Sequence, residues 1–170
     1  SLDGYRLGDA GHDGPFVDGV TLAAGAWLVV VANGADDSGT PQVPTFPFKL
    51  SASAGDSVRL TDPDGTLLDL VMLGPLEVNQ SFGRLPDGEG VPALLPSPSP
   101  GRSNEDAGEG EGEGEGECVP PFASAPPVVI NEVEVANSAT LVDGEYAPWI
   151  ELYNTSDAVV PLAGLVLADN

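Results

Sequence analysis

The side chains of this chain best suited to chemistry are aspartates in turn-like segments, because Ca²⁺ prefers oxygen ligands. Their spacing is not that of an EF-hand loop, in which alternating acidic residues are followed by a distal glutamate. Aspartate is also common in turns because its side chain hydrogen-bonds to the nearby backbone, and we favour that second interpretation. The candidate calcium ligands are Asp9, Asp13, Asp36, Asp37, Asp62 and Asp64.

The single histidine and the single cysteine argue against catalysis and zinc binding. His12 lies in a glycine-rich, loop-like run, and Cys118 follows an acidic glycine-rich stretch. A zinc site or a nucleophilic triad needs several such side chains at fixed geometry, and the sequence contains no Gly-x-Ser-x-Gly motif. We therefore expect no enzyme, no catalytic residue and no cofactor apart from the calcium considered above.

Several polar residues stand beside strongly apolar strand positions. Asn131, Glu132, Glu151 and Asn154 could bind a ligand, but in a sandwich such groups more often fix strand ends and loops by hydrogen bonding, which we favour. Arg84 precedes a Leu-Pro-Asp-Gly turn. We expect it to pair with a carboxylate such as Glu132 or Glu151, and anion binding is the alternative.

The two tryptophans are candidates either for the core or for a sugar-binding platform. Trp27 is followed by Leu28 and Val29, and Trp149 is followed by Ile150. Apolar neighbours favour a core position for both. The argument is weaker for Trp149, which follows a proline at the start of a strand.

The charge excludes several kinds of partner. The chain has 27 acidic and five basic residues, a formal net charge of −22, and such a charge repels nucleic acid and anionic lipid. The longest apolar run, residues 20–32, is shorter than the ~20 residues of a membrane span. The residues from Ser1 onward lack the charged and apolar regions of a signal peptide, so we expect none in this segment.

The elements that position these side chains are short strands, separated by an acidic spacer. Between residues 105 and 127 the chain contains five Gly-Glu pairs and a proline-rich end, a composition typical of a disordered linker. The predicted division is a domain over 1–104, a linker over 105–127 and a further part over 128–170. The predicted strands run over 2–7, 20–22, 27–32, 46–50, 57–61, 67–73, 81–85, 128–135, 149–153 and 162–168.

Local signals make an all-β fold the prediction. Asp62-Pro63-Asp64-Gly65 supplies proline at a preset φ and glycine for positive φ, so the strands on either side of it should form an antiparallel hairpin. The end of the chain also repeats its beginning. Residues 161–169 align with residues 1–9, with leucine, glycine, leucine and aspartate at matching positions, which indicates an internal repeat.

These segments together resemble a lamin-tail domain. Residues 129–133, 149–154 and 162–169 are similar to the amino-terminal half of that family. The residues that are similar to the carboxy-terminal half of the family are 2–9, 22–30, 55–60, 81–88 and 99–104. The chain therefore resembles the end of one copy, a linker and the start of a second copy.

The resemblance implies an immunoglobulin-like β-sandwich, without catalytic residues, in an extracellular or cell-surface protein. The trailing strands are those that the leading copy lacks, so they should complete one sandwich as a circular permutation. A flexible spacer of about 23 residues has an r.m.s. span of roughly 27 Å, which permits this closure and also strand exchange with neighbouring copies.

The expected function is a non-catalytic binding or spacer module of a larger multidomain protein, with a protein or cell-surface partner. The alternatives are a calcium-stabilised adhesion module and an accessory segment attached to an extracellular hydrolase.

Overall fold

The computed structural model describes residues 16, 19–34, 43–107, 126–163 and 165–169. This part of the chain is all-β, with one 3₁₀ turn, η1 (Asn104–Ala107), and no helix long and apolar enough to cross a membrane. The strands before the linker are β1 (Thr21–Leu22), β2 (Trp27–Val31), β3 (Asp56–Thr61), β4 (Leu67–Leu73), β5 (Ser81–Gly83) and β6 (Ala93–Leu94). Those after it are β7 (Val128–Glu134), β8 (Trp149–Asn154), β9 (Val160–Pro161) and β10 (Val166–Asp169).

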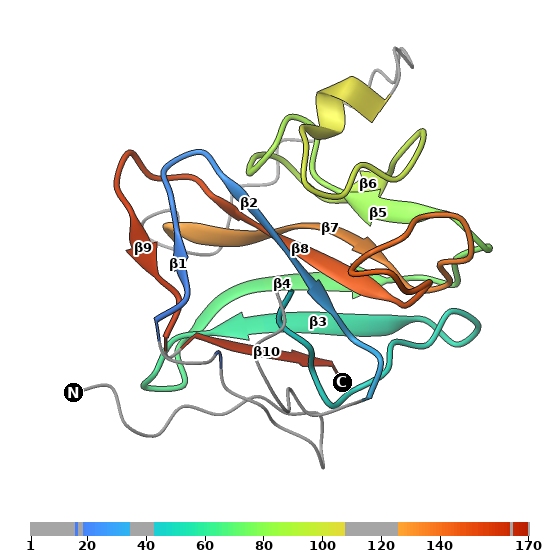
Figure 1. The fold of residues 1–170 in the computed structure, drawn as a ribbon, viewed down its shortest axis with the longest axis horizontal. Helices are drawn as coiled ribbons and strands as arrows, with labels where there is room; N and C mark the ends of the chain where they lie inside the picture. The colour runs from blue at the N-terminus through green and yellow to red at the C-terminus, as the bar shows by residue number, and fades with distance from the viewer. Residues whose placement is uncertain (1–15, 17–18, 35–42, 108–125, 164, 170) are drawn as a thin grey trace.

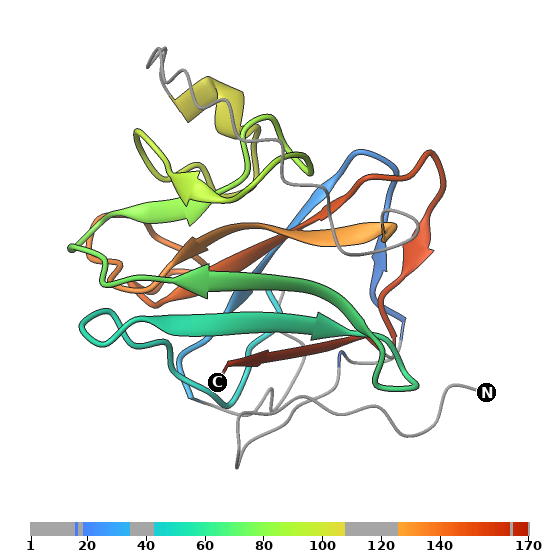
Figure 2. The same ribbon diagram turned by 180° about the vertical axis from the view of Figure 1, so that it is seen from behind.

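The described strands form antiparallel sheets in a sandwich-like arrangement (Figure 1). The largest sheet has the order β2-β8-β7-β5-β6, and a smaller one has the order β10-β3-β4. β1 and β9 form a third, two-stranded ribbon at one end. From behind, β3 and β4 run below β7 and β5 as neighbouring layers of one body (Figure 2).

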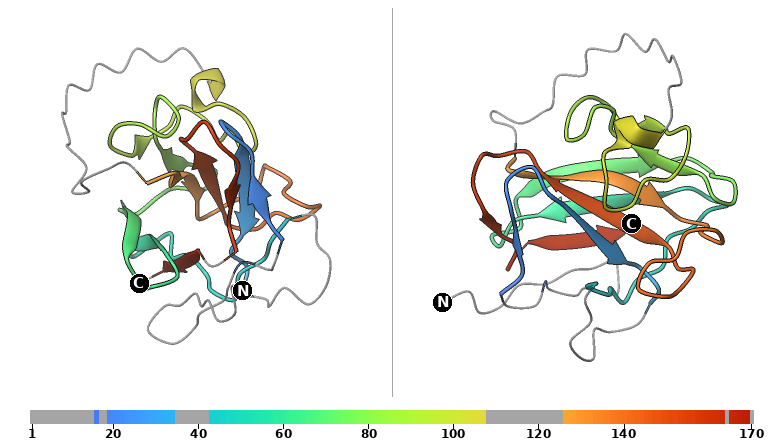
Figure 3. Two further views of the ribbon diagram at one scale, coloured as in Figure 1. Left: turned by 90° about the vertical axis from the view of Figure 1, so that its left-hand side faces the viewer. Right: turned by 45° about the horizontal axis from the view of Figure 1, so that its top comes forward.

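Strands from the two sides of the linker interleave in every sheet. β8 lies between β2 and β7, β7 pairs with β5, β10 pairs with β3, and β9 pairs with β1. Figure 3 shows the red and orange trailing strands set among the blue and green leading strands. Each pairing is antiparallel, and the two parts of the sequence share one framework of backbone hydrogen bonds.

Both parts of the sequence also contribute to one core. Leu60 and Val30 from the leading part are fully buried together with Ile130, Ile150 and Leu167 from the trailing part. Full burial of one such side chain stabilises the fold by about 1.5–3 kcal/mol. Loss of either part would therefore expose the core of the other.

The hairpin predicted around Asp62 is confirmed. β3 and β4 pair antiparallel, and Gly65 adopts φ +82°, which only glycine accepts easily. Asp62 Oδ1 accepts hydrogen bonds from the backbone N–H groups of Asp64 (3.0 Å) and Thr66 (2.8 Å). The turn is therefore stabilised by its own first aspartate.

Two predicted strands are wrong in extent. Within residues 46–50 only Lys49 forms an isolated bridge, with Asn33, and Thr45 just before this range forms another with Val31. Phe46 is buried, but Pro44 and Pro47 lack the N–H groups that a ladder needs. The last strand begins at 166 and not at 162, because the preceding residues form a turn closed by a Leu165 N–H to Leu162 carbonyl hydrogen bond. β6 and β9 were not predicted, and the predicted strand over 2–7 lies outside the described residues.

Candidate functional site

Two glutamates on neighbouring strands form the centre of a buried polar network. Glu132 on β7 and Glu151 on β8 are paired residues, and both side chains are fully buried. The register of β7 shifts between Ile130 and Glu132, so Asn131 is the extra residue of a β-bulge. A bulge changes the direction of the side chains around it. All seven residues of β7 are buried, Asn131 among them.

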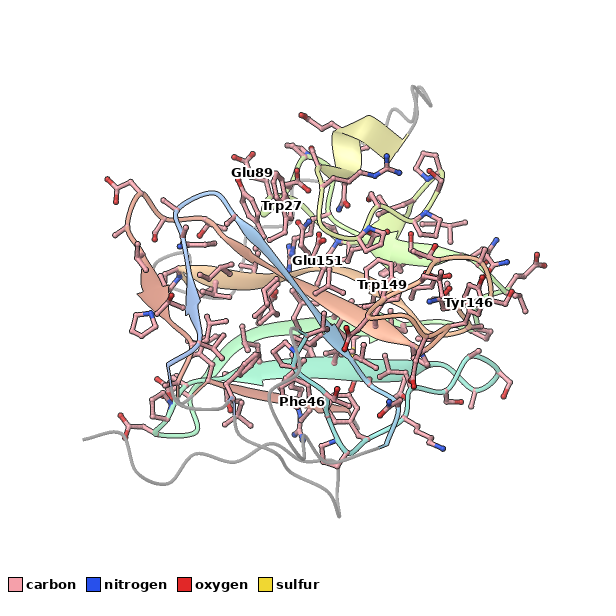
Figure 4. The ribbon with its side chains drawn as sticks, in the orientation of Figure 1. Trp27, Phe46, Glu89, Tyr146, Trp149 and Glu151 are labelled. Carbon is pink, nitrogen blue, oxygen red and sulfur yellow. The ribbon has the colours of Figure 1, made fainter. Side chains whose placement is uncertain are left out.

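The loop between β5 and η1 is fastened to the sheet by these carboxylates. The Ser99 N–H lies 3.1 Å and 3.2 Å from the two oxygens of Glu132, and the Gly101 N–H donates to Glu151 Oε2 at 2.6 Å. The backbone N–H groups of a covered loop need acceptors, and a carboxylate is a strong one. Figure 4 shows Glu151 in the interior, beneath this loop.

Asn131 connects the two strands to the same loop. Its Nδ2 donates to Asp87 Oδ1 at 2.8 Å and to Glu151 Oε1 at 3.0 Å, and its Oδ1 accepts from the Gly88 N–H at 2.9 Å. Gly88 has φ +73°, and a Cβ there would lie 2.7 Å from the Tyr153 ring. Glycine is therefore required where the loop turns against β8.

The hydrogen bonds around Ser99 favour the protonated form of Glu132. Asn104 Nδ2 donates to the Arg84 carbonyl at 2.7 Å, so its Oδ1 is the atom that lies 2.7 Å from Ser99 Oγ. Ser99 Oγ is also 2.9 Å from Glu132 Oε2, but a hydroxyl has only one proton to donate. All three groups are satisfied when Ser99 donates to Asn104 and a protonated Glu132 donates to Ser99.

The environment raises the pKa values of these carboxyl groups in the same direction. Burial raises the pKa of Glu151 to about 8, against the partial lowering by hydrogen bonds from Asn131 and the Gly101 N–H. Burial likewise raises the pKa of Glu132, and the nearby charge of Asp87 adds to the rise. Two adjacent carboxylates without a close cation disfavour double ionisation.

The carboxylate that pairs with Arg84 is Asp69, and the predicted pairing with Glu132 or Glu151 is wrong. Arg84 Nη2 lies 2.8 Å from Asp69 Oδ1, and both side chains are largely buried. Arg84 Nε donates to the Ile130 carbonyl at 3.0 Å and Nη1 donates to the Gly90 carbonyl, while Asp69 Oδ2 accepts from the Ile130 N–H at 2.8 Å. Through the backbone of Ile130 the pair joins β4 to β7.

The remaining singled-out residues fix other parts of the framework. Asn154 Nδ2 donates to the carbonyls of Leu22, Ala23 and Ala158, at 2.8 to 3.0 Å, and so ties the β1–β2 connection to β8. Trp149 is fully buried and donates from Nε1 to Glu134 Oε2 at 2.6 Å. Burial raises the pKa of Glu134.

Trp27 is the more exposed of the two tryptophans, the reverse of the order expected from sequence. It is half-buried, and its ring lies 5.6 Å from that of Tyr153. Figure 4 shows Trp27 near the periphery and Trp149 in the interior. The neighbours of Trp27, Leu28 and Val29, are themselves only partly buried and pack at the margins of the core.

Four of the six candidate calcium ligands lie outside the described residues. Asp9, Asp13, Asp36 and Asp37 lie outside the described residues, as do His12 and Cys118. Asp62 uses Oδ1 for its own turn. Within the described ranges no group of three or more His, Cys, Asp or Glu side chains is arranged to hold a metal ion.

The network is thus a set of acceptors enclosed by the chain itself. Asp69, Asp87, Ser99 and Asn104 were not singled out as site residues from sequence, since most of their partners are 15 or more residues away and only the fold brings them together. The sequence signal that was available for this loop is the Ser-Pro-Gly-Arg-Ser-Asn run over 99–104.

Comparison with family models, with curated proteins and with solved structures finds no match for this chain.

Proposed function

We propose that this chain is a non-catalytic binding or spacer module of a larger secreted or cell-surface protein. The observation that carries the proposal is the enclosure of Glu132 and Glu151, whose carboxyl groups contact the loop backbone and are fully buried. A general acid or nucleophile has to reach its substrate. The two carboxyl groups instead accept hydrogen bonds from the backbone N–H groups of the loop.

We further propose that the sandwich is lamin-tail-like and immunoglobulin-like, assembled as a circular permutation from parts of two copies. The support is the pairing of β8 with β2 and of β10 with β3, which joins segments that resemble opposite halves of that family. The resemblance between residues 1–9 and 161–169 supports the same origin.

A binding or spacer role also agrees with the charge. A net charge of −22 keeps such modules soluble and apart from one another, and it favours a partner surface that is neutral or basic. The partner is accordingly a protein or another cell-surface component rather than nucleic acid.

Hydrolytic assays test the absence of catalysis. The whole chain and its Glu151→Gln variant are incubated with chromogenic esters, phosphates and glycosides, with Glu89→Gln as a control at an exposed glutamate of the same loop. We expect no turnover by any of the three. Turnover that Glu151→Gln abolishes and Glu89→Gln retains would contradict the proposal.

Thermal melts in millimolar calcium and in chelator separate the plain module from a calcium-stabilised adhesion module. An ion that binds only the native state raises the melting temperature of the protein. We expect superimposable melts, and an increase of several degrees in calcium would favour the adhesion module.

A further inference from the structure

One segment that covers the larger sheet is held in place with little apolar burial. Residues 96–104, which we name the strap, follow β6 and end at the first residue of η1. The buried residues of the strap are Ser99 and Asn104, and both are polar. Segments with few buried apolar contacts open locally at a lower free energy than the core of a protein. The closed position of the strap therefore depends on its polar contacts.

Three backbone N–H groups of the strap donate to carboxyl groups of three different residues. The pairs are Ser99 with Glu132 at 3.1 Å, Gly101 with Glu151 at 2.6 Å and Asn104 with Asp87 at 3.1 Å. Prolines at positions 96, 98 and 100 have no N–H group with which to join a sheet. The strap is thus fastened to the sheet through carboxyl groups, and its hold depends on their state.

The carboxyl groups beneath the strap lie close to one another. Glu132 and Glu151 are directly paired across β7 and β8, and the charge of Asp87 acts on both of them from the loop. Glu134 lies two positions further along β7, and its pKa is also raised in part by Glu132. Ionisation of either buried glutamate therefore places like charges together in surroundings that water does not reach.

The two arginines of this region have other positions. Arg84 lies 2.8 Å from Asp69 and donates to the carbonyls of Ile130 and Gly90. Arg102, on the strap itself, has an exposed side chain, and an exposed charge is screened by water. An ionised Glu132 or Glu151 is consequently stabilised more by contact with water than by the closed strap.

We propose that residues 96–104 form a pH-sensitive strap, which is closed over protonated Glu132 and Glu151 and opens locally, with both sheets still paired, when these groups lose their protons. Burial under the closed strap raises the pKa of Glu151 from 4.5 to about 8. Contact with water in the open state returns the pKa toward 4.5. The closed state is then fully favoured below about pH 4.5 and loses this advantage as the pH rises to about 8.

Trypsin cleavage of the full-length chain between Arg102 and Ser103 measures the opening. The rate of cleavage follows the open population when opening and closing are fast relative to cleavage. Rates at pH 6 and pH 8 are divided by those of a synthetic peptide of residues 98–106, which corrects for the pH dependence of trypsin itself. Cleavage after Arg59 reports global unfolding, because β3 is paired on both sides. Mass spectrometry identifies which bond is cleaved first.

We expect the first cleavage after Arg102, with a corrected rate that rises about 50-fold from pH 6 to pH 8 through Glu151 alone. Glu151→Gln should make this rise several-fold smaller, and Glu89→Gln, at an exposed glutamate before the strap, should leave it unchanged.

Three results would overturn the proposal. A corrected rate that is the same at both pH values excludes a pH-sensitive strap. Cleavage after Arg59 as early as after Arg102 excludes local opening. A rise in Glu151→Gln equal to that of the parent chain excludes control by this carboxyl group. Should Glu151→Gln fail to fold, Glu132→Gln takes its place, and the parent chain alone still decides the first two points.

Discussion

The carboxyl groups of Glu132 and Glu151 are placed on directly paired residues of β7 and β8, and neither side chain is exposed. Each one accepts a backbone N–H of the loop over 99–101. An isolated buried charge costs several kcal/mol unless it is paired or neutralised. Hydrogen bonds to the two carboxyl groups lower this cost, and so do their raised pKa values, which favour the neutral form.

The stability of the chain should fall as the pH rises. The pKa of Glu151 in the folded chain is about 8, above its usual value of 4.5, so the folded state binds the proton more tightly than the unfolded state. Stability is then highest below about pH 4.5 and is lost between that value and about pH 8, by up to about 5 kcal/mol for this group. Urea unfolding at a series of pH values measures the change.

Glu151→Gln should flatten this pH dependence, since the amide does not titrate. The exposed Glu89→Gln should leave it as in the parent chain. A free energy of unfolding that rises between pH 5 and pH 8 would contradict the assignment of raised pKa values.

Asn131→Ala should destabilise the chain by about 2–4 kcal/mol. The substitution removes the hydrogen-bond partner of Glu151, Asp87 and the Gly88 N–H at once, and a buried group left without a partner costs about 1–3 kcal/mol. Urea denaturation gives the value. Gln80→Ala, which removes one exposed hydrogen bond to Glu77, is the control and should cost less than about 1 kcal/mol. Equal effects of both substitutions would show that Asn131 is not a hub.

Arg84→Ala should cost about 3–5 kcal/mol, because it leaves Asp69 buried without its counter-ion. Arg102 is exposed, and Arg102→Ala should change stability by less than about 0.5 kcal/mol. A double-mutant cycle with Asp69→Asn isolates the coupling of the pair. Additive effects of the two substitutions would rule out a direct contribution of the ion pair.

Local signals in the sequence predicted the elements whose causes are local. The turn at Asp62 and the two strands around it depend on residues within one hairpin, and they form as expected. Pro44 and Pro47 were an equally local signal against a strand over 46–50. The prediction was wrong there because it gave more weight to the apolar residues Phe46 and Phe48.

The site depends on contacts that no local pattern specifies. Asp69 on β4 and Arg84 directly after β5 meet because both side chains bond the backbone of Ile130 on β7. Asn131, the extra residue of the bulge in β7, meets Asp87. Sequence indicated that polar strand residues would hold loops in place. It did not indicate which loop, because the connecting chain between 84 and 104 folds back over strands that follow it in sequence.

A comparison of thermal melts tests the central claim, that both sides of the linker build one sandwich. The proteins are the whole chain, a chain that ends at Asn104, and a whole-length control in which the glutamates of the Gly-Glu pairs are replaced by serine. We predict one cooperative transition for the whole chain and for the control, and none for the shortened chain, because β7 and β8 supply the centre of the larger sheet. A shortened chain that melts like the whole chain would contradict the account.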